Sequence, residues 1–208
     1  MKIDKDIKRN NYEGVSLPKT RRGQATFDRL LKAAEDIIGD KGYHDTSIYS
    51  ITEQAGVAMG TFYLYFRGKK DIFRELIYHI HHDVRKYIQI AIKDIPDRKE
   101  AEIEGIKAFF HYCLEHPNLY ALIREAEFVD IEIFKWYYTN FSKGYAEHLE
   151  DAMEKKQIKQ MDPEALAFCL MGISIFTGMR WTLWEQKLPD EKQLETIREF
   201  ILKGLAPG

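Results

Sequence analysis

Apolar residues recur three and four positions apart along most of this chain, and this spacing constrains its fold more than any other feature of the sequence. A first stripe of this kind lies between residues 27 and 38 and stops at Gly39 and Gly42. A period of 3.6 residues is that of an α-helix with one buried face. No alternating apolar runs are joined by Asn-Gly or Asp-Gly, the usual turn of a β-hairpin. The sequence therefore predicts an all-α protein.

The spacing predicts about nine helices, which we expect to begin and end near residues 23–39, 48–55, 60–66, 69–93, 97–115, 118–127, 130–156, 163–184 and 190–203. The fourth is about 37 Å long at 1.5 Å per residue, enough to connect two domains. The segment 60–66 also suits a strand by propensity, but an isolated strand would leave its backbone unpaired. We expect four parts: a flexible basic arm (1–22), a helix-turn-helix domain (23–68), a connecting helix (69–96) and a ligand-binding and dimerisation domain (97–208).

The formal net charge of −2 conceals an uneven distribution of charge. Residues 1–75 hold 14 Lys and Arg against 11 Asp and Glu, whereas residues 76–208 hold 17 against 22. The first 25 residues hold three acidic and seven basic side chains, the latter being Lys2, Lys5, Lys8, Arg9, Lys19, Arg21 and Arg22. A basic arm on an otherwise acidic chain indicates a polyanion contact at one end. The alternative is a solvated, disordered tail.

The composition is that of an ordinary globular protein and excludes disordered, collagen-like and coiled-coil chains. The chain is 45% apolar over 208 residues, so it can bury a core without a disulfide or a structural metal. We therefore expect Cys113 and Cys169 to be reduced and buried in a cytoplasmic protein. The first residues, M-K-I-D-K-D-I-K-R, contain no apolar segment of the kind found in signal peptides. Neither a nucleotide-binding loop nor a hydrolase or metalloprotease motif occurs, so we expect no enzyme and no cofactor.

A short helix ended by Ala55-Gly56-Val57 and followed by the aromatic segment Gly60-Thr-Phe-Tyr-Leu-Tyr-Phe66 has the outline of a helix-turn-helix. Together with Gly42-Tyr43 before it and Lys69-Lys70-Asp71 after it, this pattern closely resembles the DNA-binding domain of the TetR family of transcriptional repressors, over about residues 22–77. Beyond residue 97 the resemblance extends only to helix number, helix length and apolar character. It implies a dimeric, ligand-responsive repressor that binds double-stranded DNA at a palindromic operator.

The resemblance also implies which residues contact DNA. Major-groove contacts fall on Met59, Gly60, Thr61 and Tyr63, phosphate contacts on Tyr65 and Lys69, and contacts from the second helix on Ser47 and Tyr49. Lys69 and Lys70 lie in the first turn of a helix, where each positive charge costs about 0.3–1 kcal/mol unless an anion is bound there. Two alternatives stay open: the lysines are merely solvated, or Tyr63 completes the core of the small domain.

Arg21 and Arg22 precede the first expected helix, and we expect them to reach phosphates or the minor groove from the flexible arm. Met59 has no hydrogen-bond donor, so its contact would be apolar.

Residues 109–145 contain eleven aromatic residues, more than twice the average density of the chain. Such rings in a helical bundle suit a cavity for a small apolar, aromatic or acyl effector, although most of them could instead be core or dimer contacts. The residues we expect to bind the effector are Phe109, Tyr112, Cys113, Tyr120, Trp136, Tyr137, Phe141, Phe176 and Arg180. For Arg180, a salt bridge to a glutamate such as Glu185 is the alternative to an effector carboxylate.

Residues 165–184 approach the length and apolarity of a membrane span, but Arg180, two glycines and the absence of a basic flank argue against one. We expect this helix and the helix over 190–203 to form a homodimer interface, where Gly172 and Gly178 allow close approach.

His79, His81 and His82 with Asp83 suggest a metal site, but a hydrated helix face is the favoured alternative. A different class of function, a helical sensor or carrier of apolar ligands that acts through protein contacts without DNA, also remains open.

Overall fold

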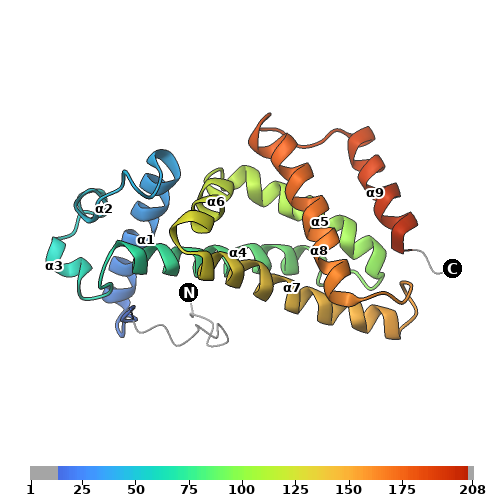
Figure 1. Ribbon diagram of the computed structural model, residues 1–208, viewed down its shortest axis with the longest axis horizontal. Coiled ribbons are helices and arrows are strands. Elements are labelled where there is room, and N and C mark those ends of the chain that lie inside the picture. Colours follow the sequence, from blue (N-terminus) through green and yellow to red (C-terminus); the bar gives the residue numbers. More distant parts are fainter. Residues whose placement is uncertain (1–13, 206–208) are drawn as a thin grey trace. The chain divides into compact units, whose positions relative to one another are not determined.

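The computed structural model describes residues 14–205, and within this range the chain is helical and contains no strand (Figure 1). The prediction of an all-α fold with about nine helices is confirmed for these residues. The helices are α1 (Arg21–Lys41), α2 (Ile48–Ala55), α3 (Met59–Phe62), α4 (Lys69–Ile92), α5 (Arg98–Glu115), α6 (Leu119–Val129), α7 (Ile131–Glu154), α8 (Pro163–Gly178) and α9 (Glu191–Leu205), with a π-helical turn η1 (Met179–Leu183) after α8.

The chain divides into two compact units. One comprises Met1–Ile80 with Ala121–Phe134, and the other His81–Tyr120 with Lys135–Gly208. Helix α4 therefore begins in the first unit and ends in the second. The sequence instead placed domain boundaries near residues 22, 68 and 96.

In the first unit, α1 to α3 enclose a small core. Phe27 and Leu30 of α1, Ile51 of α2 and Phe62 of α3 are completely buried. Helix α1 begins two residues earlier than predicted because the side chain of Thr20 accepts the amide proton of Gly23 at 3.0 Å, which caps the helix before Arg21. These four side chains, contributed by three helices, fix how α1, α2 and α3 pack.

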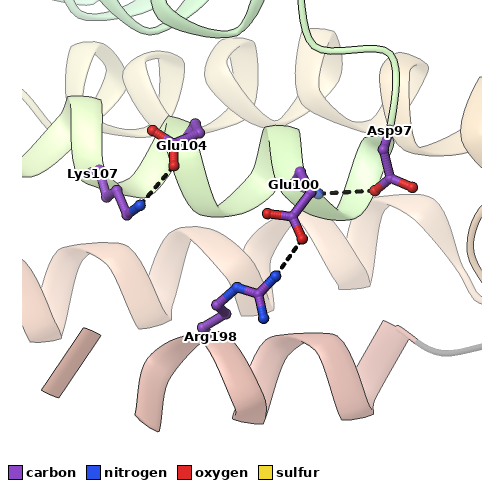
Figure 2. A network of polar contacts seen from close by, with 5 residues as sticks. All are labelled: Asp97, Glu100, Glu104, Lys107 and Arg198. Carbon is purple, nitrogen blue, oxygen red and sulfur yellow. Dashed lines mark hydrogen bonds and ion pairs between the residues drawn. The ribbon is translucent and has the colours of Figure 1, made fainter. Parts of the chain in front are cut away.

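In the second unit, α5 packs against both α8 and α9. The Asp97 side chain accepts the Glu100 amide at 3.0 Å and caps α5, as the sequence predicted. The Glu100 carboxylate pairs with Arg198 of α9, and this pair joins the two helices (Figure 2). Beneath it, the buried Glu102 carboxylate pairs with Arg98 and accepts the Tyr145 hydroxyl.

Two local predictions are wrong. Helix α3 ends at Phe62 rather than near residue 66, although Phe62 and Phe66 are both buried as expected. The arm predicted over residues 1–22 is packed where the structure describes it: the Ser16 amide donates to the Tyr65 carbonyl at 2.8 Å, and Val15 forms an isolated β-bridge with Phe66. Lys2, Lys5, Lys8 and Arg9 lie outside the described residues.

Pro163–Leu183 is the one segment, among the described residues, that is long and apolar enough to cross a membrane by length and composition. Only 28% of its most apolar stretch is buried within the chain. Unlike the core helix of a compact monomer, this segment has exposed apolar side chains, among them Phe168 and Phe176.

Candidate DNA-binding interface and effector region

The aromatic core of the first unit holds α3 in place. The ring of Phe66 lies 5.1 Å from that of Phe27 and 5.3 Å from that of Phe62, and all three side chains are buried. Contacts of this kind favour one ring arrangement over others. Because the core fixes Phe62 and Phe66, the residues between them have a defined position on the surface.

Helix α2 is short because both of its ends are fixed by local hydrogen bonds. Ser47 and Ser50 form a reciprocal capping box at its start. Gly56 ends the helix in the left-handed conformation, with φ 63° and ψ 43°, and this position favours glycine. Ser47, predicted to contact DNA, is exposed while it performs this capping role.

The first turn of α2 and the segment from α3 to Tyr63 present polar and apolar side chains to solvent. Tyr49 is 60% exposed and Tyr63 is 54% exposed, and Met59 and Gly60 are also exposed. The alternative in which Tyr63 completes the core is therefore wrong. Thr61 is half-buried. Together with the exposed Ser47, these residues are the part of the predicted interface on α2 and α3 that is available to a large partner.

Tyr65 is half-buried, and its hydroxyl donates to the Gly23 carbonyl at 3.3 Å. Its ring lies 5.6 Å from Phe27 in an edge-to-face arrangement. Tyr65 thus ties the turn after α3 to the first turn of α1, while its predicted phosphate contact stays a prediction.

Lys69 has an internal role that the sequence did not predict. Its ammonium group donates to the carbonyl oxygens of Tyr43 and Thr46, both at 2.6 Å, and of His44 at 3.3 Å. It also lies 4.3 Å from the centre of the Tyr43 ring. These acceptors use all three ammonium protons, so Lys69 holds the loop between α1 and α2. Burial lowers the pKa of this ammonium group, against the opposing effect of Asp45 and Glu125.

Lys70 and Arg74 both pair with Asp130, the residue between α6 and α7. The Lys70 ammonium lies 3.3 Å from the carboxylate, and its side chain remains half exposed. Burial raises the pKa of the Asp130 carboxyl, but hydrogen bonds and charges from Arg74 and Lys70 outweigh it and hold the pKa below its ordinary value. Close by in sequence, Glu125 accepts the Tyr43 amide at 3.3 Å. The sequence did not predict these acidic partners, because long-range pairing leaves no periodic signal.

Arg21 and Arg22 are exposed, as expected, but they form the first turn of α1 instead of a flexible arm. Lys19 is also exposed, just before that turn. The three cations therefore lie on, or directly before, an ordered helix, close in sequence to the half-buried Gly23.

Most of the predicted effector residues fall into two clusters, and the others are exposed. In the first cluster, the Tyr120 hydroxyl donates to the Ile175 carbonyl at 3.3 Å and lies 3.8 Å from the Cys113 sulfur. The ring of Phe109 lies 6.4 Å from that of Tyr120. Burial raises the pKa of the Cys113 thiol to about 12, which makes it unreactive.

Gly178 lies against this first cluster, because an added Cβ would touch the Tyr120 hydroxyl and come within 3.3 Å of Phe109. The prediction that Gly178 allows close approach of a second chain is therefore wrong; it allows close packing within this chain.

The second cluster surrounds His81 of α4. Its ring lies 4.8 Å from Trp136, 5.6 Å from Tyr137 and 5.9 Å from Phe141, all on α7. Since His81 is buried, it does not belong to a hydrated helix face, and that expectation is wrong for this residue. Tyr112 is also buried, with its ring 5.4 Å from that of Tyr87.

Two of the predicted effector residues lie outside both clusters. Phe176 is 70% exposed on α8, and Arg180 pairs with Glu185, the alternative left open by the sequence. Cys169 is exposed on α8, so its predicted burial is wrong within a single chain.

The second unit also has an open cleft of about 340 Å³ at the end of α4 and α7. Its lining combines charged and polar side chains, such as Arg98 and Asp151, with apolar ones, such as Ile92 and Ile95. None of the predicted effector residues lines it. Across the described range 14–205, no group of three or more His, Cys, Asp or Glu side chains is arranged to hold a metal ion.

A family model described as bacterial regulatory proteins of the tetR family matches residues 30–76, which span α1 to α4. A curated relative from Bacillus subtilis, an uncharacterized HTH-type transcriptional regulator YdgC, is 28% identical over 89% of this chain and 95% of its own length. The fatty acid metabolism regulator protein of Bacillus subtilis is 25% identical over 86% of this chain and 95% of its own.

Among solved structures, the transcriptional regulator FadR from Bacillus subtilis in complex with stearoyl-CoA matches with a TM-score of 0.69 and 25% identity. The match covers 86% of this chain and all of that one, so it extends well beyond the DNA-binding domain. The family match, the relatives and the helix-turn-helix geometry agree: the chain belongs to the tetR family of bacterial transcriptional regulators.

Proposed function

We propose that this regulator binds a palindromic operator as a homodimer and is released from it by a small apolar effector, which makes it a repressor. The observation that carries this proposal is the exposure of Tyr49, Met59 and Tyr63 around a rigid aromatic core. Outward-facing tyrosines on a short helix-turn-helix suit the major groove, where side chains reach base edges and phosphates. We assign DNA contact to these residues with Ser47, Gly60 and Thr61, and phosphate contact to Arg21, Arg22, Tyr65 and Lys70.

A second copy of this chain is the partner we propose for α8 and α9. Phe176 of α8 and Phe200 of α9 are each 70% exposed, and Phe168 and Trp184 are exposed nearby along the chain. Exposed apolar residues gathered on neighbouring helices mark an association surface. A twofold interface would present two α3 helices to successive major grooves, about 34–36 Å apart, and thus a palindromic site.

For the effector, we propose a molecule with a substantial apolar part, in the class of acyl compounds. Support comes from the buried aromatic side chains of α5, α6 and α7, and from relatives described as a regulator of fatty acid metabolism and as a complex with stearoyl-CoA. We propose that effector binding shifts α4, the helix shared by both compact units, and thereby changes the spacing of the two α3 helices. We expect the protein to act in the cytoplasm.

Salt dependence tests the DNA-binding part of this proposal. Duplexes selected from random sequence by the full-length protein should be palindromic, and their affinity should fall steeply as salt increases. A protein that binds DNA weakly, without sequence preference and without a salt effect would instead be a sensor or carrier that acts through protein contacts. Higher expression of the controlled genes on deletion of the regulator identifies a repressor, and lower expression contradicts that part.

A further inference from the structure

His81 and Arg85 lie one helical turn apart on α4, and both contact α7. The ring of His81 is enclosed by Trp136, Tyr137 and Phe141. The guanidinium of Arg85 lies directly over Gly144, since a Cβ added there would be 2.6 Å from an Nη atom. We call these six residues the aromatic seam.

Within residues 14–205, neither basic side chain of the aromatic seam has a polar partner. His81 is only 4% exposed, and its Nε2 is buried without a hydrogen-bond partner in the described chain. Arg85 is half-buried, and we find no hydrogen bond or ion pair between it and any residue in the range 14–205. A buried polar group without a partner is costly, so native proteins rarely retain one without a function.

The electrostatics of the seam define the ligand that fits it. Burial, together with the charge of Arg85 and neighbouring His82, lowers the pKa of His81 to about 3. His81 is therefore neutral and offers one N–H donor, while Arg85 is the cation. A planar guanidinium binds a carboxylate through two parallel hydrogen bonds, a geometry that a point charge such as lysine lacks.

We propose that Arg85 and His81 bind the carboxylate of an amphiphilic effector whose apolar body packs on the rings of the aromatic seam. This inference rests on the proposed effector response and names the chemistry of its ligand. Arg85, Phe141 and Gly144 are each partly exposed, so the seam reaches the surface where a ligand can enter. The sequence pointed to Arg180 for this role, but Arg180 is satisfied by Glu185. The sequence signal that could have indicated this subsite is the spacing of His81 and Arg85, which lie four positions apart on one helix.

Calorimetry and tryptophan fluorescence on the full-length protein without DNA test the subsite. The probes are decanoate and 4-phenylbutyrate, which distinguish an alkyl from an aromatic body, and their methyl esters, which lack the charge. We expect at least one acid to bind better than its ester. Arg85→Gln should weaken binding of that acid by about tenfold to a hundredfold and leave the ester unaffected. Lys86→Gln removes the same charge from the neighbouring exposed residue and should change nothing.

Gly144→Ala is the second variant, and it retains every charge. Its new methyl group displaces the end of the flexible Arg85 side chain, so we expect about a tenfold loss of acid binding with an unchanged or higher thermal midpoint. Equal binding of acid and ester, or acid binding that neither variant weakens, overturns the carboxylate subsite. So does an acyl-CoA that binds when the free acid does not. Because no DNA is present, failure here is separate from failure of operator binding.

Discussion

The two compact units use similar side chains in opposite ways. In the first, Tyr49 and Tyr63 are exposed around a buried aromatic core, and three carbonyl groups satisfy the half-buried Lys69 ammonium. In the second, Tyr137 and His81 are buried, and the His81 Nε2 has no hydrogen-bond partner in the described part of the chain. A large partner needs groups displayed on a rigid surface, whereas a small ligand needs groups directed into the fold. On this basis we propose that the first unit contacts DNA and the second binds the effector.

The largest effect should come from the exposed face of α8 and α9. Glutamate in place of both Phe176 and Phe200 would bury unpaired charges in a dimer, at about 3–5 kcal/mol for an uncompensated charge. We expect monomers in sedimentation and operator affinity at least about a hundredfold lower. The matched control is Phe128→Glu, which alters an 81% exposed phenylalanine of α6 outside this face. A dimer that survives the double substitution would assign the interface elsewhere.

Tyr63→Ala should weaken operator binding by about 1–3 kcal/mol, the range for a specific base contact. Because the side chain is exposed, the thermal midpoint should stay within the error of the wild type. Fluorescence anisotropy on a labelled operator measures the loss. If affinity is retained, the outward tyrosine is not a DNA contact, and the first half of the comparison fails.

His81→Phe should change how stability depends on pH. With a pKa of about 3 in the folded state and 6.5 in the unfolded state, the wild type loses stability as pH falls from 6.5 toward 3, because only the unfolded chain takes up the proton. At pH 5 this loss is about 2 kcal/mol. Urea unfolding at pH 7 and pH 5 should show this loss of unfolding free energy in the wild type and in the exposed-histidine control His111→Gln. The loss should be absent in His81→Phe. An unchanged pH dependence in His81→Phe would show that the histidine is solvated.

Lys69→Ala should lower the free energy of unfolding by about 1–2 kcal/mol, because three carbonyl groups lose a charged donor. Lys70→Ala should cost less than about 1 kcal/mol, since its side chain is half exposed. In salt titrations of operator binding, Lys70→Ala should flatten the log–log slope by about one unit and Lys69→Ala much less. Full stability with a flattened slope for Lys69→Ala would restore the phosphate role.

The helix-turn-helix was predictable from sequence because its signals are local. Gly56, the Ser47 cap and the buried pair Phe62 and Phe66 lie within one short stretch, and each acts on its immediate neighbours. The early end of α3 and the internal role of Lys69 were not predictable in this way. Lys69 donates to the carbonyl of Tyr43, which lies 26 positions away. The residues after α3 pair instead with Val15 and Ser16, far back in the chain.

The aromatic composition of the effector region was visible in the sequence, but the arrangement of its side chains was not. Helix α8 is apolar on every side, so its sequence does not indicate whether Phe176 faces inward or outward. His81 was assigned to a hydrated face because the charged residues beside it dominate the local pattern. Only the packing of α4 on α7 shows that it is enclosed by aromatic rings.

The measurement that tests the account most directly is operator affinity of the full-length dimer as an acyl ligand is added. Anisotropy of the selected duplex should show at least about a tenfold loss of affinity at saturating ligand, and by linkage the operator should lower ligand affinity by the same factor. Calorimetry in the same buffer establishes saturation. Operator affinity that stays constant while the ligand is bound would contradict the proposed coupling of the two units.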